Sequence, residues 1–351
     1  MKNLHIIKAF LIAGLLYSGT ASAGNPDRVG QAGATELLIN PWARSTGWGN
    51  ANSGAVRGLE ATFLNVAGIA HTAKTDVGFA HTSFLRGSQV GINAFGLTQR
   101  VGESSVMGLT IMSMDYGDID ITTTSIPEGG IGTFKPQMIN IGLSYAKAFS
   151  NSIFGGFTVK IINENISNVG AQGLAVDAGI QYVTGTNESR DNIRFGIALK
   201  NVGTPMKYGG DGLSTRLTAP SGNYTMTIEQ RTEGFEIPSL LSIGAAYDFK
   251  PAENHRITTA ASYCSNSFSN DQTTVGVEYA FREFFMLRGG FTYEKNIFDD
   301  ALRATVFTGP SAGMTLEAPL GKSGKKFSID YSIRFTNPFD NTHTFGAKLT
   351  L

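Results

Sequence analysis

Histidine is the side chain with the widest catalytic and metal-binding use, and the histidines here are not spaced to form such a site. They are His5, His71, His81, His255 and His343, and no two stand at the close spacing of a metal-binding pair. The zinc-protease pattern H-E-x-x-H does not occur. His81 falls in a predicted strand, where a few barrel hydrolases place a histidine, yet an interfacial histidine near a strand end is the simpler interpretation. We therefore expect no enzymatic activity, no cofactor and no metal.

Charge and cysteine content argue against a nucleic-acid-binding protein and against a disulfide-stabilised protein. The chain has 28 basic and 28 acidic residues, a formal net charge of zero, which gives no electrostatic reason to expect a nucleic-acid partner. Cys264 is the only cysteine, so no disulfide framework exists, and we interpret it as a small buried side chain.

The first 23 residues have the pattern of a cleaved signal peptide. Lys2 and Lys8 give a basic start, a short apolar run follows, and Ala21-Ser22-Ala23 is a small-residue cleavage pattern. The apolar run is shorter than the roughly 20 residues of a spanning helix. No long apolar run follows it, so the sequence excludes a helical membrane protein.

Large apolar residues at every second position dominate the chain from Asp76 to its end. In the last stretch they are Phe327, Ile329, Tyr331, Ile333 and Phe335. Polar or charged residues stand between them, and a period of two predicts a strand with unlike faces. After a turn the alternation resumes and continues to Leu351, which predicts a final strand that closes a barrel by pairing with the first.

About fourteen such stretches occur, an even number of the kind that bacterial barrels have. One of them, around Arg303 to Leu316, is interrupted by Gly309-Pro310, which indicates a kink or bulge. The chain has 43 glycines and 23 phenylalanines but a mean hydropathy of only −0.04. This fits strands with one apolar and one polar face, because the two faces offset each other in the mean hydropathy. The strands of a soluble sandwich have the same period, but aromatic residues recur here at strand ends, as in membrane girdles. The longest connections, 116–137 and 204–236, both follow odd-numbered strands. The sequence thus predicts an all-β transmembrane antiparallel barrel over 76–351, in the outer membrane of a Gram-negative bacterium.

Residues 24–75 lack this alternation and predict short helical turns broken by glycine. Such a segment, rich in large apolar residues and ahead of a barrel, is expected to lie beneath the barrel or to fill it as a plug. Arg44 and Arg57 are expected to meet inward acids of the wall such as Asp177, Glu278 or Asp330, although the sequence does not assign the pairs. Our candidate plug residues are Trp42, Arg44, Gly47, Trp48, Gly49, Asn65 and Gly68.

This segment resembles the opening of PorV/PorQ-type proteins, relatives of the FadL fatty-acid channel. The resemblance lies in Leu37-Leu38-Ile39, in Ala43-Arg44 followed by Gly47-Trp48-Gly49, and in Asn65-Val66-Ala67-Gly68. Val66 stands where the group commonly has proline, and Trp48 where it commonly has methionine. The resemblance implies a FadL-like barrel of about 14 strands from Bacteroidetes-like bacteria, associated with type IX secretion.

Three functions remain open. The resemblance favours a non-enzymatic partner of other outer-membrane secretion or assembly proteins, and of exported cargo, in protein transport. The alternative is a FadL-like channel for hydrophobic small molecules, which rests on kinship of fold alone. An open diffusion porin is the third, against which the expected plug argues. The long loop 204–236 is a candidate binding surface for a partner, through Met206, Tyr208, Gly209, Gly210 and Phe235.

Overall fold

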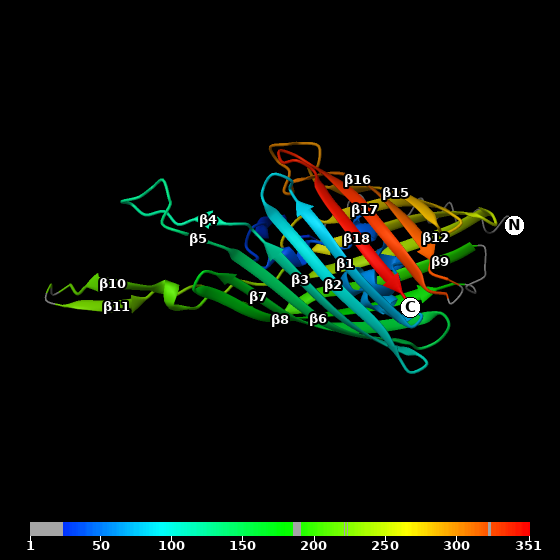
Figure 1. Ribbon diagram of the computed structural model, residues 1–351, viewed down its shortest axis with the longest axis horizontal. Helices are drawn as coiled ribbons and strands as arrows, with labels where there is room; N and C mark the ends of the chain where they lie inside the picture. The colour runs from blue at the N-terminus through cyan, green and yellow to red at the C-terminus, as the bar shows by residue number, and fades with distance from the viewer. Residues whose placement is uncertain (1–23, 185–190, 221, 223, 322–323) are drawn as a thin grey trace.

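In the computed structural model, fourteen antiparallel strands form a closed barrel (Figure 1). The described residues are 24–184, 191–220, 222, 224–321 and 324–351, so the predicted signal peptide lies outside them. The barrel strands are β1 (Thr75–Phe84), β2 (Val90–Val101), β3 (Ser105–Asp115), β6 (Pro136–Ala148), β7 (Ile153–Ile166), β8 (Val169–Val183), β9 (Asp191–Gly203), β12 (Leu240–Ala252), β13 (His255–Asn266), β14 (Gln272–Phe281), β15 (Phe285–Glu294), β16 (Phe307–Pro319), β17 (Lys326–Thr336) and β18 (Thr342–Thr350). The predicted all-β, fourteen-stranded fold is confirmed.

The barrel closes as the final stretch of sequence predicts. β18 pairs with β17 on one side and with β1 on the other, from Asp76 opposite Thr350 to Ser83 opposite His343. Closure leaves no open edge of unpaired backbone groups, and this is the condition for a sheet to stand in hydrocarbon.

Alternation along each strand separates an apolar outer face from a buried inner face. On β8, Ile180 is 61% exposed and Leu174 and Val176 are also exposed, whereas Asp177 between them is only 3% exposed. The same pattern recurs around the barrel, so its outer surface is far more apolar than water-facing surfaces usually are. A bilayer is the environment that such a surface fits.

The two longest connections project from one end of the barrel, although the tight turn of Ser167 and Asn168 between β7 and β8 lies there too. Two long loops carry small sheets of their own, β4 (Ile119–Asp120) with β5 (Thr133–Phe134), and β10 (Ser214–Thr218) with β11 (Thr225–Glu229), the latter preceded by the turn η7 (Asp211–Leu213). Both project from one end of the barrel, away from the C-terminus (Figure 1). We call this the loop end and the opposite one the turn end.

The chain enters the barrel interior before it forms the wall. Residues 24–74, called the inner segment below, contain the short helices η2 (Pro26–Arg28), η3 (Thr35–Leu38), α2 (Ala43–Thr46), η4 (Ala51–Gly54), η5 (Gly58–Glu60), α3 (Ala61–Leu64) and η6 (Val66–His71). The segment begins at the loop end, where the Gly24 nitrogen donates to Asp271, and ends where β1 starts at the turn end. Figure 1 shows it in blue within the ring of strands.

No helix in the described part of the chain is both long enough and apolar enough to cross a bilayer.

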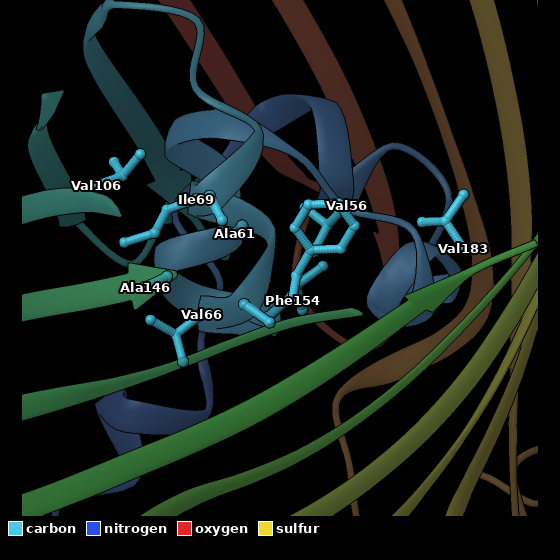
Figure 2. Packing of buried hydrophobic residues seen from close by; sticks show 11 residues of the cluster. Val56, Ala61, Val66, Ile69, Val106, Ala146, Phe154 and Val183 are labelled. Atoms are coloured by element: carbon cyan, nitrogen blue, oxygen red, sulfur yellow. The ribbon is translucent and has the colours of Figure 1, made fainter. Parts of the chain in front are cut away.

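At the turn end, η6 packs against the inner face of four neighbouring strands (Figure 2). Val66 and Ile69 of the helix are buried with side chains that the wall supplies. The wall residues are Val106 on β3, Ala146 on β6, Phe154 on β7 and Val183 on β8. This apolar cluster fills the interior on that side of the barrel.

Candidate functional site: the filled barrel interior

Glycines of the wall allow the inner segment to approach the strands at backbone distance. A Cβ on Gly290 would lie 2.4 Å from the backbone of Trp48, and one on Gly47 would lie 3.0 Å from Gly313. Gly49 has a φ of +67°, which L side chains rarely adopt, and a Cβ there would meet Thr292 at 2.8 Å. Any larger residue at these positions would push the segment off the wall.

The two tryptophans anchor different sides of the segment. Trp42 is buried with Leu59 against Ala80 and Ala94 of β1 and β2. Trp48 packs with small residues toward β12 and β13. Each side chain removes a large apolar surface from water, which stabilises the docked position of the segment.

Asn65 binds the backbone of the wall. Its Nδ2 donates to the carbonyl oxygens of Ile180 at 3.2 Å and Ile197 at 3.4 Å, and its Oδ1 accepts from the nitrogen of Ala67. Gly68 follows in the same turn, where a Cβ would lie 2.1 Å from the carbonyl oxygen of Val56. The candidate residues from Trp42 to Gly68 therefore all contact the wall or fix the shape of the segment.

Arg44 is the main ionic contact between segment and wall. Its guanidinium lies 3.1 Å from Asp330 and 3.0 Å from Glu317. Burial acts against its charge, but the carboxylates of Asp330, Glu60 and Glu317 raise the pKa of Arg44 well above its ordinary value. The predicted pairing with an inward acid is thus found for Arg44.

Arg57 shows no such pairing among the described contacts. Burial and the positive charge of Arg194 lower its pKa to about 10, against a smaller opposing effect of Asp248. The two other acids proposed as partners are already engaged, Asp177 with Lys160 at 2.6 Å and Glu278 with arginines of the wall.

The loop end of the interior is lined by apolar residues. Inward-facing residues of β2 and β3 form a buried cluster there with Met138, Tyr116 and Ile39. We call this the apolar basin, and its members are Ile39, Phe84, Ile92, Val90, Met112, Met114, Tyr116 and Met138. Sequence reasoning missed it, although the even-numbered positions of β3 hold Met112 and Met114 on the face that turns inward.

A small cavity of about 50 Å³ lies beneath the basin. Trp42, Phe63 and Met112 supply part of its apolar lining, and Asn140 and Lys160 are polar side chains at its wall. A cavity of about 150 Å³ is needed to hold a benzene molecule. In this conformation the cavity is therefore too small for a hydrocarbon ligand.

The candidate partner residues of the long loop form its base. Met206 is buried against Leu37 of the inner segment, and Tyr208 and Phe235 cover it with ring centroids 5.4 Å apart. Gly209 pairs with Gly170 of β8, and Gly210, with a φ of +136°, begins the turn that follows. These residues join the loop to the barrel, and the exposed apolar side chains of the loop lie farther out, on β10 and β11.

Potential catalytic groups are not gathered. His81, His255 and His343 each pair through Nδ1 with a neighbouring Asn or Tyr side chain. The run from Gly309 to Gly313 does match the hydrolase pattern G-x-S-x-G, but Ser311 lies in β16 and donates to the Gly290 carbonyl oxygen, without the strand-to-helix turn of that pattern. In the described residues no group of three or more His, Cys, Asp or Glu side chains is placed to hold a metal ion.

The chain is similar in fold to solved hydrocarbon channels. The CymD monoaromatic hydrocarbon channel has a TM-score of 0.52 and 12% identity, with 89% of this chain and 97% of that chain covered. The Pseudomonas putida toluene transporter TodX has a TM-score of 0.54 and 8% identity, with 89% and 97% covered. A TodX deltaS2S3 mutant has a TM-score of 0.56 and 11% identity, with 88% and 97% covered. No protein-family model and no curated protein matches the chain.

These similarities show the fold, which is that of a FadL-like membrane barrel similar to outer-membrane proteins of Gram-negative bacteria. The three solved structures are channels and not enzymes. They give no support to PorV/PorQ membership, to type IX secretion or to a Bacteroidetes-like source.

Proposed function

We propose that this protein is a non-enzymatic outer-membrane channel that admits hydrophobic small molecules. The observation that carries the proposal is the apolar basin at the loop end, because a porin that passes solutes through water has a polar interior. In an outer membrane the loop end faces the medium and the turn end the periplasm. An apolar ligand entering from outside would first meet Met112, Met114 and Met138, whose flexible side chains adapt to different shapes.

The filled interior sets a condition on transport. The cavity beneath the basin is smaller than a benzene site, so a ligand has to displace side chains of the inner segment before it passes. Such displacement makes the protein selective for ligands that bind the basin first. Small polar solutes bind the apolar basin too weakly to displace these side chains, so they are excluded.

Ligand binding is measurable through Trp42, which lines the cavity. Trp48 is the only other tryptophan and lies in a different cluster, so a Trp48→Phe protein reports on Trp42 alone. Titration with toluene is expected to give a saturable change in its emission, and titration with maltose none. Met112→Gln in that background is expected to weaken toluene binding about tenfold, since it replaces buried apolar surface worth roughly 1–2 kcal/mol.

Met107→Gln is the matched control, because Met107 lies on the same strand with its side chain facing outward. It is expected to leave the titration unchanged. An intact protein without a saturable response to toluene or to a medium-chain fatty acid would contradict the proposed channel. Equal effects of the two methionine substitutions would remove the basin as the binding site.

A second function, as a binding partner of other outer-membrane proteins or exported cargo, is favoured by one observation. The β10–β11 hairpin stands away from the barrel and has unlike faces. Leu217 pairs with Met226 and Thr215 with Ile228 on one face, and Leu217, Met226 and Ile228 are all exposed. An apolar face that covers nothing else in the described chain suits contact with another protein.

A further inference from the structure

Buried acceptor oxygens without a donor gather at the loop end of the interior. Glu36 of η3 is 2% exposed, and neither of its carboxylate oxygens has a hydrogen-bond partner in the described chain. Glu164 of β7, also 2% exposed, has an unpartnered Oε1, and Asn140 of β6, 9% exposed, has an unpartnered Oδ1. Buried polar atoms are rarely left in this state, so these four oxygens require an explanation.

Strand register and local electrostatics place the three side chains together. In the β6–β7 ladder Asn140 lies opposite Ile162 and Met138 opposite Glu164, so Asn140 and Glu164 are diagonal neighbours on the inner face. Glu36 lies beside them, since Leu37, the next residue, packs with Ile162 of β7. Burial and then the charge of Glu164 raise the pKa of Glu36 to about 7.

The loops close over this group. The hydroxyl of Tyr208 donates to Oε2 of Glu164. Tyr116 lies nearby as well, since its hydroxyl donates to the sulfur of Met138 at 3.2 Å and Met138 is paired with Glu164 across the two strands. The site is therefore built from the inner segment, two wall strands and two loops.

No basic side chain in the described part of the chain forms an ion pair with either carboxylate. Lys160, on the same strand as Glu164, is bound to Asp177 at 2.6 Å and to Asn201 at 2.7 Å. The negative charge of Glu164 acts on Glu36. Two ionised carboxylates buried side by side are costly, since each loses its hydration and repels the other, so the pair has to bind a proton or a cation.

We propose that Glu36, Glu164 and Asn140 form a binding site for a hard divalent cation, with Ca²⁺ as the preferred ion. Ca²⁺ takes six to eight oxygen ligands from carboxylates, amide carbonyls and water, and Glu36, Glu164 and Asn140 supply the first two kinds. Two carboxylates balance its charge. Because the site has only two acids and one amide, we expect an affinity in the range of extracellular Ca²⁺ modules, with a Kd on the order of 10⁻⁴–10⁻³ M.

A bound cation would fasten the start of the inner segment to the wall, since Glu36 belongs to the first and Glu164 to the second. This site does not depend on the proposed channel function. It would be occupied whether the basin admits hydrocarbons or not.

Terbium luminescence tests the site, because Tb³⁺ substitutes for Ca²⁺ and is sensitised by nearby tyrosines such as Tyr208. Chelator-treated, purified protein titrated with Tb³⁺ is expected to show one saturable signal that Ca²⁺ displaces. Glu36→Gln and Glu164→Gln are each expected to weaken binding at least about tenfold. Glu294→Gln is the matched control, a buried carboxylate at the same end of the barrel whose oxygens accept from Asn270 and Gln272.

A second measurement, of thermal stability, tests the site on the intact protein even if a variant folds poorly. Ca²⁺ at 10 mM is expected to raise the temperature at which the intact protein loses its folded migration in gel electrophoresis, because a ligand of the folded state stabilises it. The Glu36→Gln/Glu164→Gln protein is expected to show no such rise. Absence of saturable Tb³⁺ binding to the intact protein, or an equal loss in Glu294→Gln, would overturn the proposal.

Discussion

A single arginine, Arg44, joins the inner segment to two acids of the wall. Arg44 holds Asp330 and Glu317 by ion pairs, and the hydroxyl of Ser45 beside it donates to Glu60 at 2.5 Å. Because these groups are largely removed from water, each depends on its partner more than surface ions do. The sequence predicted the pairing of Arg44 with an inward acid such as Asp330, but it gave no means to find Glu317.

Arg44→Met is expected to destabilise the protein by about 3–5 kcal/mol, since it leaves Asp330 buried without its cation. Asp330→Asn added to Arg44→Met is expected to recover part of this loss, because an amide needs no counter-ion. Urea unfolding in lipid vesicles measures both. The interpretation fails if the double variant is less stable than Arg44→Met alone.

His71 makes the turn end of the inner segment sensitive to acid. Its ring packs on Phe154 with centroids 4.1 Å apart, and burial, followed by the charges of Arg57 and Arg194, lowers its pKa to about 3, although Gln181 acts in the opposite direction. The folded pKa is below the ordinary 6.5, so the undocked state binds more protons at acid pH. The favourable free energy of docking η6 on the wall is thus fully present above about pH 6.5 and decreases as the pH falls toward 3.

From pH 7.5 to pH 5 the loss is expected to reach about 2 kcal/mol. It would appear as more frequent openings in planar-bilayer recordings. His71→Gln, which stays neutral, is expected to remove most of this acid response while leaving the recordings at pH 7.5 unchanged. An acid response of the same size in His71→Gln would assign it to other groups.

At the scale of elements, the hairpin β10–β11 offers a comparison between its own two faces. Leu217→Ser with Met226→Ser removes the apolar face, whereas Arg216→Ala with Thr227→Ala alters the opposite one. If the hairpin docks a protein partner, the Leu217→Ser/Met226→Ser protein is expected to lose the partner protein that co-purifies from native membranes after cross-linking. The Arg216→Ala/Thr227→Ala protein is expected to retain it. Neither pair touches the buried base at Met206, so the barrel should remain folded. Identical co-purification from both would exclude the apolar face as a docking surface.

For the whole molecule, the sequence predicted the wall in detail and the interior only as a filling segment with an ionic contact at Arg44. Alternation along the strands gave their number and closure, and the predicted irregularity at Gly309-Pro310 is found as a register shift between Phe307 and Ser311. Alternation cannot say what an inward side chain meets. The contacts of Asn65 with Ile180 and Ile197, and the group around Glu36, depend on how a segment without periodicity folds inside a closed ring.

Whether the barrel conducts ions depends on how completely the inner segment fills it. The inner segment contacts the wall from the loop end to the turn end, and the cavity beneath the basin has a volume of only about 50 Å³. We therefore expect the purified protein to show little or no steady single-channel conductance. Deletion of residues 34–70 should produce clear conductance, because a fourteen-stranded ring without filling leaves a water-accessible path.

The substitution Gly290→Leu provides a milder form of the same experiment. It places a side chain where the Trp48 backbone now lies and leaves the strand ladder intact, so it should loosen the segment without removing it. Intermittent openings are expected from this protein, against none from Gly289→Leu on the outer face, where nothing lies within 4 Å. A large, steady conductance from the intact protein would show that the segment leaves an open path, and the protein would then act as a diffusion porin.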